Sequence, residues 1–371
     1  MLTEGGHRLA RRLIDGVSKE EKFQSNRKST KRGKIPKSNK EKHQKRKIAK
    51  SNKEKYQIRK FQSPNKKFQS PIKTQLNNNM PHPEVVLPTL CLLGEGTLWH
   101  AAQNCIYWID IIPGDIHRYS VDKKTHDIFN IGQMIGAIAI RKNGGFVAAM
   151  QHGFYFVDFD NKTIQPITDP EKSLPGNRFN DGKCDPAGRF WAGTMPLNEK
   201  DAVGNLYMLD TDLSVTLKVP NVTISNGLAW SRDYSTLYYI DTPTRYVVAY
   251  DFDVANGNIG NKRIVIDVHH EKGYPDGMTI DEAGMLWIAF YGGWRVAQYN
   301  PNTGKLLQEI QFPVANITCC TFGGPLLQDL YVSTAKKELS PDELLAQPLA
   351  GSLFVINDVG SKGIPAFEFA G

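Results

Sequence analysis

The chain has 371 residues, of which 40% are hydrophobic and 23% are charged, and its formal net charge is +8. It contains no run of 18 apolar residues and no apolar segment typical of a secretory signal, so we expect neither secretion nor a membrane span. Its five cysteines form no CxxC pair and indicate reduced thiols rather than a disulfide framework. These features favour a cytoplasmic protein.

The charge is divided unevenly along the chain. Residues 1–80 hold 24 of the 46 Lys and Arg but only 6 of the 38 Asp and Glu, so the remaining 291 residues carry a net charge of −10. The basic segment repeats short polar strings, such as Lys37-Ser38-Asn39-Lys40, and shows no apolar periodicity. Because such a segment buries too little apolar surface to offset its ordering entropy, we predict a disordered tail over 1–80 and a folded domain over 81–371.

Two roles of the tail stay open. The basic run Lys45-Arg46-Lys47 is typical of a nucleic-acid contact or a nuclear address, whereas the composition alone requires no more than a solvated linker. Nucleic acid is therefore expected as a partner only through the tail. A nuclear location is expected only if the tail serves as an address.

Six short apolar strings recur along residues 81–371. Several follow a turn of the form polar-x-x-Gly, such as Asp185-Pro186-Ala187-Gly188. The central residues of the strings, 39 to 49 positions apart, are Tyr107, Phe146, Phe190, Tyr238, Trp287 and Tyr331. A hairpin turn and an apolar strand that return about every 40–50 residues predict an all-β fold, a six-bladed β-propeller.

Four polar segments rich in glycine or proline lie upstream of these strings, in loops that we expect to precede strands. They are Gly94-Glu95-Gly96, residues 177–183, Ser225-Asn226-Gly227 and Pro275-Asp276-Gly277. Taken singly, the segments at Glu95, Asn226 and Asp276 are weak signals, because a hairpin turn also explains them, whereas residues 177–183 favour a ligand contact over a turn. Their recurrence at similar places in different blades favours a shared site, because a propeller gathers segments from every blade around one channel.

The residue types in these segments point to two kinds of contact. The carboxylates of Glu95 and Asp276 with the carboxamide of Asn226 form an oxygen ligand set that suits a hard divalent cation. Arg178 and Asn180 are two positions apart, so in an extended segment both point to the same side. Their donors and acceptor suit a polyhydroxylated or carboxylate-bearing ligand.

Residues from about 85 to 371 resemble the SMP-30/gluconolactonase/luciferin-regenerating-enzyme family, and the basic tail lies outside the resemblance. The matching strings occur in order, and they are Gly94-Glu95, Leu98-Trp99, residues 177–183, 185–189, 192–195, 224–228 and 275–278, Cys319-Cys320, and residues 322–324. So many ordered matches are not expected by chance.

The resemblance implies one divalent cation, Ca²⁺, Zn²⁺, Mg²⁺ or Mn²⁺, in the channel of a six-bladed propeller. Its metal ligands fall on Glu95, Asn226 and Asp276, and Asp276 is also the implied general acid/base. Its substrate-binding residues fall on Arg178 and Asn180. A third substrate residue of the family, a glutamate, aligns with Asn198, while Glu199 follows one position later.

The function implied by the resemblance is the metal-dependent hydrolysis of small sugar lactones to aldonic acids. The alternative is a calcium-binding regulatory protein that uses the same ligands without catalysis. The pair Arg178 and Asn180 favours the enzyme, because an ion sensor needs no clamp for a sugar beside its metal.

Overall fold

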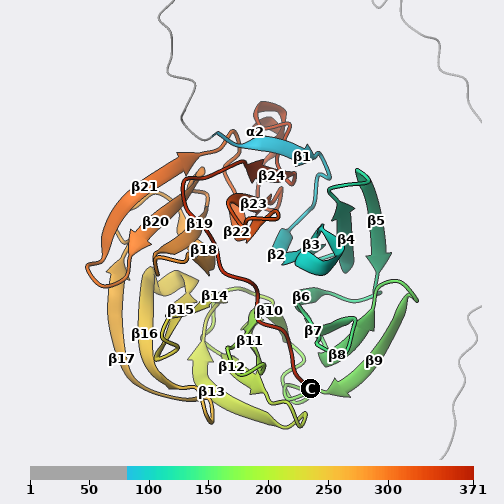
Figure 1. Cartoon of the computed structure of the whole chain (residues 1–371), viewed down its shortest axis with the longest axis vertical. Coiled ribbons are helices and arrows are strands. Elements are labelled where there is room, and N and C mark those ends of the chain that lie inside the picture. Colours follow the sequence, from blue (N-terminus) through green and yellow to red (C-terminus); the bar gives the residue numbers. More distant parts are fainter. Residues whose placement is uncertain (1–81) are drawn as a thin grey trace, which may run out of the picture. The chain divides into compact units, whose positions relative to one another are not determined.

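The computed structural model describes residues 82–371, so the predicted disordered tail lies outside the described residues, and the domain boundary near residue 80 stays a prediction. The described residues form six four-stranded antiparallel sheets that are arranged as blades around a common axis (Figure 1). This confirms the predicted six-bladed β-propeller. Among residues 82–371, no helix is long and apolar enough to cross a bilayer.

The strands of each blade are given from the axis outward. Blade 1 contains β2 (Gly94–His100), β3 (Cys105–Asp110), β4 (Asp115–Ser120) and β5 (Thr125–Asn130). Blade 2 contains β6 (Ile135–Ile140), β7 (Phe146–Met150), β8 (Gly153–Asp158) and β9 (Thr163–Thr168). Blade 3 contains β10 (Asn177–Cys184), β11 (Phe190–Pro196), β12 (Gly204–Leu209) and β13 (Val215–Val222).

Blades 4 to 6 continue the pattern. Blade 4 contains β14 (Ser225–Trp230), β15 (Thr236–Asp241), β16 (Tyr246–Asp253) and β17 (Asn258–Asp267). Blade 5 contains β18 (Tyr274–Ile280), β19 (Leu286–Tyr291), β20 (Arg295–Asn300) and β21 (Lys305–Gln311). Blade 6 contains β22 (Ile317–Gly323), β23 (Asp329–Thr334), β24 (Leu353–Ile356) and β1 (Glu84–Leu87). A short helix, α2 (Pro341–Ala346), lies between β23 and β24.

The six apolar strings predicted from the sequence lie in the second strand of every blade, β3, β7, β11, β15, β19 and β23. These strands are buried over almost their whole length, because the neighbouring blades cover both of their faces. A strand that is buried on both faces has apolar residues at almost every position, so it is the strand that a sequence reveals most clearly. The outermost strands β5 and β9 are largely exposed, and their sequence signal is weak.

The ring is closed by strands from opposite ends of the described chain. β1 pairs antiparallel with β24, with Val85 opposite Phe354, so the first strand completes the last blade. The innermost strands β2 and β22 also pack against each other, as do the other neighbouring pairs of innermost strands around the axis. Closure therefore joins blade 6 to blade 1 and leaves no open end of the ring.

The polar-x-x-Gly turns are fixed by a repeated aspartate–tryptophan contact. In blade 3, buried Asp185 accepts a hydrogen bond from the indole Nε1 of Trp191 at 2.9 Å. In blade 5, Asp281 accepts the corresponding bond from Trp287 at 3.0 Å. Each aspartate also accepts backbone N–H groups of its own turn, so the turn and the second strand of the blade are held as one unit.

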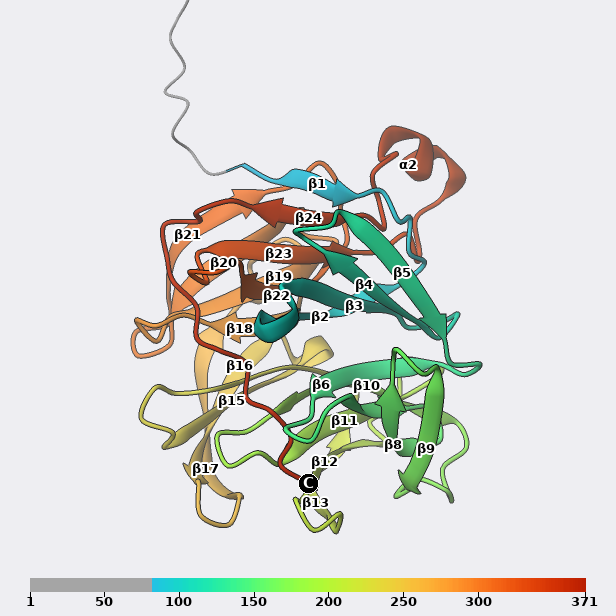
Figure 2. The ribbon, with the colours of Figure 1, turned by 45° about the vertical axis from the view of Figure 1, so that its right-hand side comes forward.

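The segment after β24 crosses the axis and ends at the C terminus beside blade 3 (Figures 1 and 2). It is tied to four blades by backbone hydrogen bonds. Gly363 N–H donates to the carbonyl oxygen of Leu327 at 2.7 Å, Phe369 N–H to that of Ile140 at 2.7 Å, and Ala370 N–H to that of Gly188 at 2.9 Å. A fourth bond runs from Glu282 in blade 5 to the carbonyl of Lys362. We call residues 357–371 the C-terminal strap.

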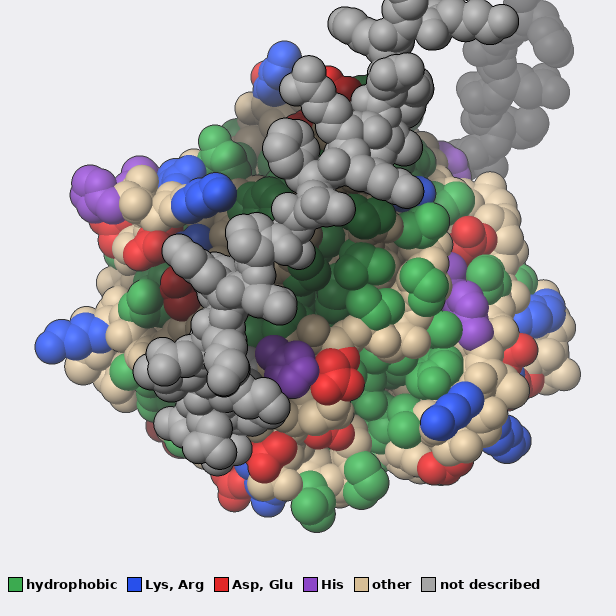
Figure 3. Space-filling view, turned by 90° about the horizontal axis from the view of Figure 1, so that it is seen from above, with side chains coloured by type: hydrophobic (Ala, Val, Ile, Leu, Met, Phe, Trp, Pro, Cys, Tyr) green, Lys and Arg blue, Asp and Glu red, His purple; other side chains and the backbone are tan. Residues whose placement is uncertain are grey.

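The outer surface mixes charged and apolar side chains. In Figure 3, the edge of the propeller that carries β1 and α2 faces the viewer, with charged side chains distributed around it and hydrophobic ones toward its middle. The apolar side chains exposed on these elements and on the segment after β1 include Val85, Leu90, Leu92 and Leu345.

Candidate metal and substrate site

A β-bulge recurs in the innermost strand of every blade. The pairing of β2 with β3 shifts register after Glu95, that of β14 with β15 after Asn226, and that of β18 with β19 after Pro275. The innermost strands β6, β10 and β22 shift at the corresponding place. The four polar segments, which we expected as loops before strands, therefore lie inside the innermost strands. A bulge re-aims a side chain locally, which explains polar residues within strands at the axis.

Glycine after the polar residue allows the innermost strands to approach each other. A Cβ on Gly227 would lie 2.6 Å from the Cβ of Met278 and 2.8 Å from the carbonyl oxygen of Asp276. A Cβ on Gly277 would lie 2.8 Å from the carbonyl oxygen of Thr318. The Asn-Gly and Asp-Gly pairs are thus required for tight packing around the axis, not for hairpin turns.

The strand entrances in blades 1 and 4 are held by aspartates at the ends of the second strands. Asp110 accepts the backbone N–H groups of Leu92 and Leu93 at 2.8 and 2.9 Å. Asp241 accepts those of Thr223 and Ile224 at 3.1 and 2.9 Å. These contacts fix the segments that lead into Glu95 and Asn226.

One cavity of about 320 Å³ brings together Glu95, Asn226, Asp276, Arg178 and Asn180. All five side chains are buried, with exposed fractions of 3–7%. Apolar residues form much of the remaining wall, and they include Leu93, Ile111, Met195, Ile224, Pro243, Tyr274 and Tyr291. A mostly apolar concave wall with a few convergent polar groups is typical of a small-molecule site.

A directed series of hydrogen bonds orients the polar groups of this cavity. Arg178 Nη1 donates to Asn180 Oδ1 at 2.7 Å, and Asn180 Nδ2 donates to Asn226 Oδ1 at 3.1 Å. Asn226 Nδ2 donates to the Thr242 hydroxyl at 2.8 Å, which donates in turn to the Pro275 carbonyl at 2.8 Å. A carbonyl can only accept, so the hydroxyl of Thr242 must accept from the amide of Asn226. This leaves the Asn226 side-chain oxygen directed away from Thr242.

The carboxylates of the site are crowded and buried. Burial and the charge of Asp181 raise the pKa of Glu95 to about 8. Burial, followed by the charges of Glu95 and Asp181, raises the pKa of Asp276 well above its ordinary value. Buried carboxylates that repel one another are stabilised by a cation.

The donor set fits a divalent ion. Two carboxylates and a carboxamide oxygen are hard ligands of the kind that Ca²⁺ and Mg²⁺ prefer. Within residues 82–371, no group of three or more His, Cys, Asp and Glu side chains is arranged as a metal site. The expected ligand set includes Asn226 and only two such residues, so it is not a cluster of that type.

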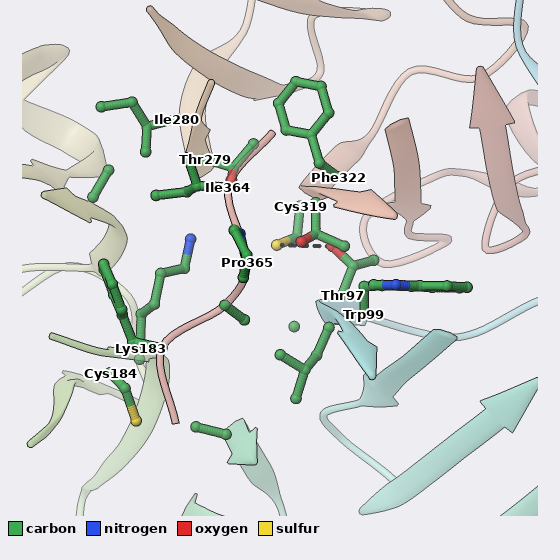
Figure 4. A pocket seen from close by; sticks show the side chains of 18 of the residues that line it. Thr97, Trp99, Lys183, Cys184, Thr279, Ile280, Cys319, Phe322, Ile364 and Pro365 are labelled. Carbon is green, nitrogen blue, oxygen red and sulfur yellow. Dashed lines mark hydrogen bonds between the residues drawn. The ribbon is translucent and has the colours of Figure 1, made fainter. Parts of the chain in front are cut away.

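A second, smaller chamber lies further along the same innermost strands and contains residues that the sequence analysis did not assign. It is lined by Asp181 and Lys183 of β10, Thr97 of β2 and Cys319 of β22, and Pro365 of the C-terminal strap runs across it (Figure 4). The ammonium of Lys183 donates to the Met278 carbonyl at 2.7 Å and so links blade 3 to blade 5. Adjacent polar residues of the string at 177–183 thus line different spaces: Asn180 lines the cavity and Asp181 lines the chamber.

Comparison with known proteins shows the family of the chain. Residues 93–336 match the model described as the SMP-30/Gluconolactonase/LRE-like region. The chain belongs to this family. Regucalcin of Oryctolagus cuniculus is 39% identical over 293 residues, which cover 78% of this chain and 98% of that protein.

Solved members of the family have the same architecture. A luciferin-regenerating enzyme superposes with a TM-score of 0.75 at 30% identity, and the match covers 78% of this chain and 99% of that one. A calcium-binding protein, regucalcin from Agrobacterium tumefaciens, superposes with a TM-score of 0.75 at 27% identity, covering 78% and 97%.

The position at which the family resemblance implied a substrate contact is arranged differently from the expectation. Asn198 is exposed, and its side chain bonds within its own loop, to Asp201 Oδ2 at 2.6 Å and to Lys200 N–H at 3.0 Å. Glu199 lines the cavity instead. The backbone of Glu199 is left-handed, with φ of 59°. Because of this turn, the side chain of Asn198 lies in solvent and that of Glu199 lies at the cavity. A gap-free alignment has no signal for such a local turn.

Proposed function

We propose that this protein is a metal-dependent lactonase that hydrolyses small sugar lactones to aldonic acids. The observation that carries the proposal is the single cavity in which a cation-binding oxygen set adjoins the paired donors of Arg178 and Asn180. Membership of a family that includes gluconolactonases supports the same reaction class.

The protein residues have distinct roles in this reaction. Glu95, Asn226 and Asp276 hold the divalent cation, which when bound supplies Lewis-acid stabilisation of negative charge on the lactone carbonyl oxygen. Arg178 and Asn180 bind the ring hydroxyls and keep the carbonyl carbon within reach of a water molecule.

Asp276 acts as the general base and general acid. Its carboxylate accepts a proton from the attacking water while the new carbon–oxygen bond forms, and it returns that proton to the ring oxygen as the ring carbon–oxygen bond breaks. Burial and the neighbouring carboxylates raise the pKa of Asp276, and a bound cation would offset this rise, so that the carboxylate is available as a base. The product is the open-chain acid, and no redox partner is needed.

The electrostatics of Arg178 favour an enzyme over a simple ion sensor. Burial lowers the pKa of Arg178 to about 10, although the charges of Glu199, Glu95 and Asp276 oppose this effect. Among the described residues, its guanidinium donates hydrogen bonds to the neutral oxygens of Phe179 and Asn180. A buried guanidinium that has carboxylates nearby but, within residues 82–371, none within 4.0 Å is only partly compensated, and its place beside the oxygen ligands suits contact with a ligand. A calcium-binding regulator has no use for it.

The test is hydrolysis of D-glucono-1,5-lactone by the full chain. The reaction is monitored by the release of protons, and the rate of spontaneous hydrolysis is subtracted. The protein is first treated with a chelator and then given Ca²⁺, Mg²⁺, Mn²⁺ or Zn²⁺ separately. Turnover that is lost with the chelator and restored by an ion supports the lactonase. Tight ion binding without turnover on several sugar lactones would favour the regulatory alternative.

A further inference from the structure

We propose that Lys337 is a positioning residue that holds the carboxylate of Glu199 over the cavity, and that this pair selects uncharged hydroxylated lactones over phosphorylated or carboxylated ones. The inference rests on the proposed lactonase function and specifies which lactones the site accepts.

Lys337 forms a short ion-paired bridge at the cavity. Its ammonium lies 2.8 Å from Glu199 Oε1 and 2.9 Å from Glu199 Oε2, and 2.8 Å from Glu338 Oε1. All three residues line the cavity. Glu199 comes from the blade 3 loop after β11, whereas Lys337 follows β23 in blade 6, so the bridge spans elements that are distant in sequence.

The backbone of Lys337 is held from three sides. Its carbonyl oxygen accepts a hydrogen bond from the Tyr291 hydroxyl at 2.8 Å and another from Asn316 Nδ2 at 2.9 Å. Its N–H donates to the Leu92 carbonyl at 2.8 Å. The side chain is only 23% exposed. With its backbone fixed, its side chain mostly buried and its ammonium bonded to two carboxylates, Lys337 forms a more defined ion pair than a single pair on the exposed surface.

Glu199 and Arg178 line the same cavity. The charge of Glu199 is the strongest factor that opposes the lowering of the Arg178 pKa by burial, yet the two side chains do not form an ion pair within 4.0 Å. The cavity therefore offers a ligand a carboxylate and, beyond ion-pair distance from it, a guanidinium with Asn180. Hydroxyls of a sugar ring can donate to Glu199 and accept from Arg178, so a hydroxylated ring uses both groups.

The charge balance of the bridge determines what it rejects. Glu199 and Glu338 carry two negative charges and Lys337 carries one positive charge, so the group has a net charge of −1. A phosphate or carboxylate placed beside Glu199, away from Arg178, meets like charge. Glu199 is only 30% exposed, so its repulsion is stronger than in bulk water, whereas Glu338 is 58% exposed and adds less. A neutral hydroxyl meets an acceptor. Lys337 thus serves as the support of Glu199 and not as an anion receptor.

The first experiment tests whether Lys337 acts by positioning Glu199 through its charge or only by packing in the cavity wall. We expect Lys337→Met to raise KM for D-glucono-1,5-lactone about tenfold with kcat changed less than about twofold, the size of one lost charged hydrogen bond. Lys337→Arg restores KM, because it keeps the cation. Lys200→Met, an exposed lysine next to Glu199, is the matched control and leaves KM unchanged. Equal KM values for Lys337→Met and wild type would overturn the inference.

The second experiment tests the selection by charge. Wild type is expected to prefer D-glucono-1,5-lactone to its 6-phosphate in kcat/KM by at least about tenfold, and Glu199→Gln narrows the ratio because it removes one of the two repelling carboxylates. A wild-type preference for the phosphorylated lactone contradicts the proposal.

A binding measurement keeps the inference testable if no lactone is turned over. The neutral ring analogue 1,5-anhydro-D-glucitol is titrated into ion-loaded protein by calorimetry. Binding that weakens about tenfold in Lys337→Met and returns in Lys337→Arg supports the bridge even if the proposed function fails. No binding to wild type, or identical binding to wild type and Lys337→Met, overturns it.

Discussion

The side-chain amide of Asn180 donates a hydrogen bond to the side-chain oxygen of Asn226, 3.1 Å away, and this contact joins the residues proposed to bind substrate to those proposed to bind the ion. On one side Asn180 is fixed by Arg178, and on the other side Asn226 is fixed by Thr242. A change in either half is therefore transmitted to the other through one amide pair.

The hydroxyl of Thr242 controls the orientation of the Asn226 amide. We expect Thr242→Val to lower the affinity for a divalent ion about 10–100-fold, the usual effect of losing a residue that orients a metal ligand. The measurement is calorimetric ion titration. Thr244→Val is the matched control, because its exposed hydroxyl bonds only to the Asp241 carbonyl and the N–H of Tyr246. Equal ion affinity in all three proteins contradicts the assigned role.

The effect of the ion on thermal stability should depend on pH. The pKa of Glu95 is raised from 4.5 to about 8, so in ion-free protein its contribution to stability is complete below pH 4.5 and is lost as pH rises through about 8. A divalent ion binds the deprotonated carboxylates and reverses this loss. We expect the increase in Tm on replacing chelator with Ca²⁺ or Mg²⁺ to be larger at pH 8 than at pH 5. In Glu95→Gln this pH dependence should be much smaller, and an increase independent of pH would argue against the site.

The role of Asp276 as the proton carrier predicts a loss in turnover rather than in substrate capture. We expect Asp276→Ala to lower kcat by at least about 10³-fold, because it removes both a general base and an ion ligand. Arg178→Ala, in contrast, should mainly raise KM. Steady-state kinetics with circular dichroism as a check on folding distinguish the two, and an unchanged kcat in Asp276→Ala would remove the assignment.

The blade repeat could be predicted from the sequence because it depends on local chemistry, whereas the ion ligands stay a prediction. Second strands such as the one around Trp287 are buried on both faces and are continuous apolar runs. The glycines after Asn226 and Asp276 mark places where backbones meet. Their interpretation as turns could not be separated from packing without the neighbouring blade, which lies about 50 residues away.

Other features could not be predicted because they depend on contacts between distant blades or on one backbone angle. Glu199 lines the cavity in place of Asn198 because the backbone at Glu199 has a positive φ. The approach of Lys337 to that residue joins positions 138 residues apart. The division of Asn180 and Asp181 between cavity and chamber follows from the bulge in β10. None of these leaves a periodic pattern.

The buried ion pair of blade 3 should be essential for stability. Asp185 is 0% exposed and accepts hydrogen bonds from Arg189 Nε at 2.6 Å and from the Trp191 indole. Because Asp185→Ala leaves the Arg189 cation buried without its partner, we expect a loss of about 3–5 kcal/mol in the free energy of unfolding. Urea denaturation measures it. Asp233→Ala, in an exposed turn of blade 4, should cost less than about 1 kcal/mol. Similar losses in both variants would contradict the role given to the buried pair.

A stacked histidine pair in blade 1 should make the fold sensitive to mild acid. His117 Nδ1 lies 3.0 Å from His126 Nε2, and both rings stack on Trp108 with interplanar angles of 12°. Burial, and then the neighbouring His126, lowers the pKa of His117 from 6.5 to about 4. The unfolded chain therefore binds more protons than the folded one between these values, and the free energy of unfolding falls as pH falls from 6.5 toward 4.

His117→Gln tests this acid sensitivity by removing the titrating ring. We expect the difference in unfolding free energy between pH 7 and pH 4.5 to be smaller in the variant than in wild type, by up to about 3 kcal/mol. The carboxylates of the cavity titrate with the opposite sign, but they are present in both proteins and cancel in the comparison. His152→Gln, at an exposed position, should retain the wild-type difference. A wild-type pH dependence in His117→Gln would show that protonation of this pair does not limit the stability of the blade in acid.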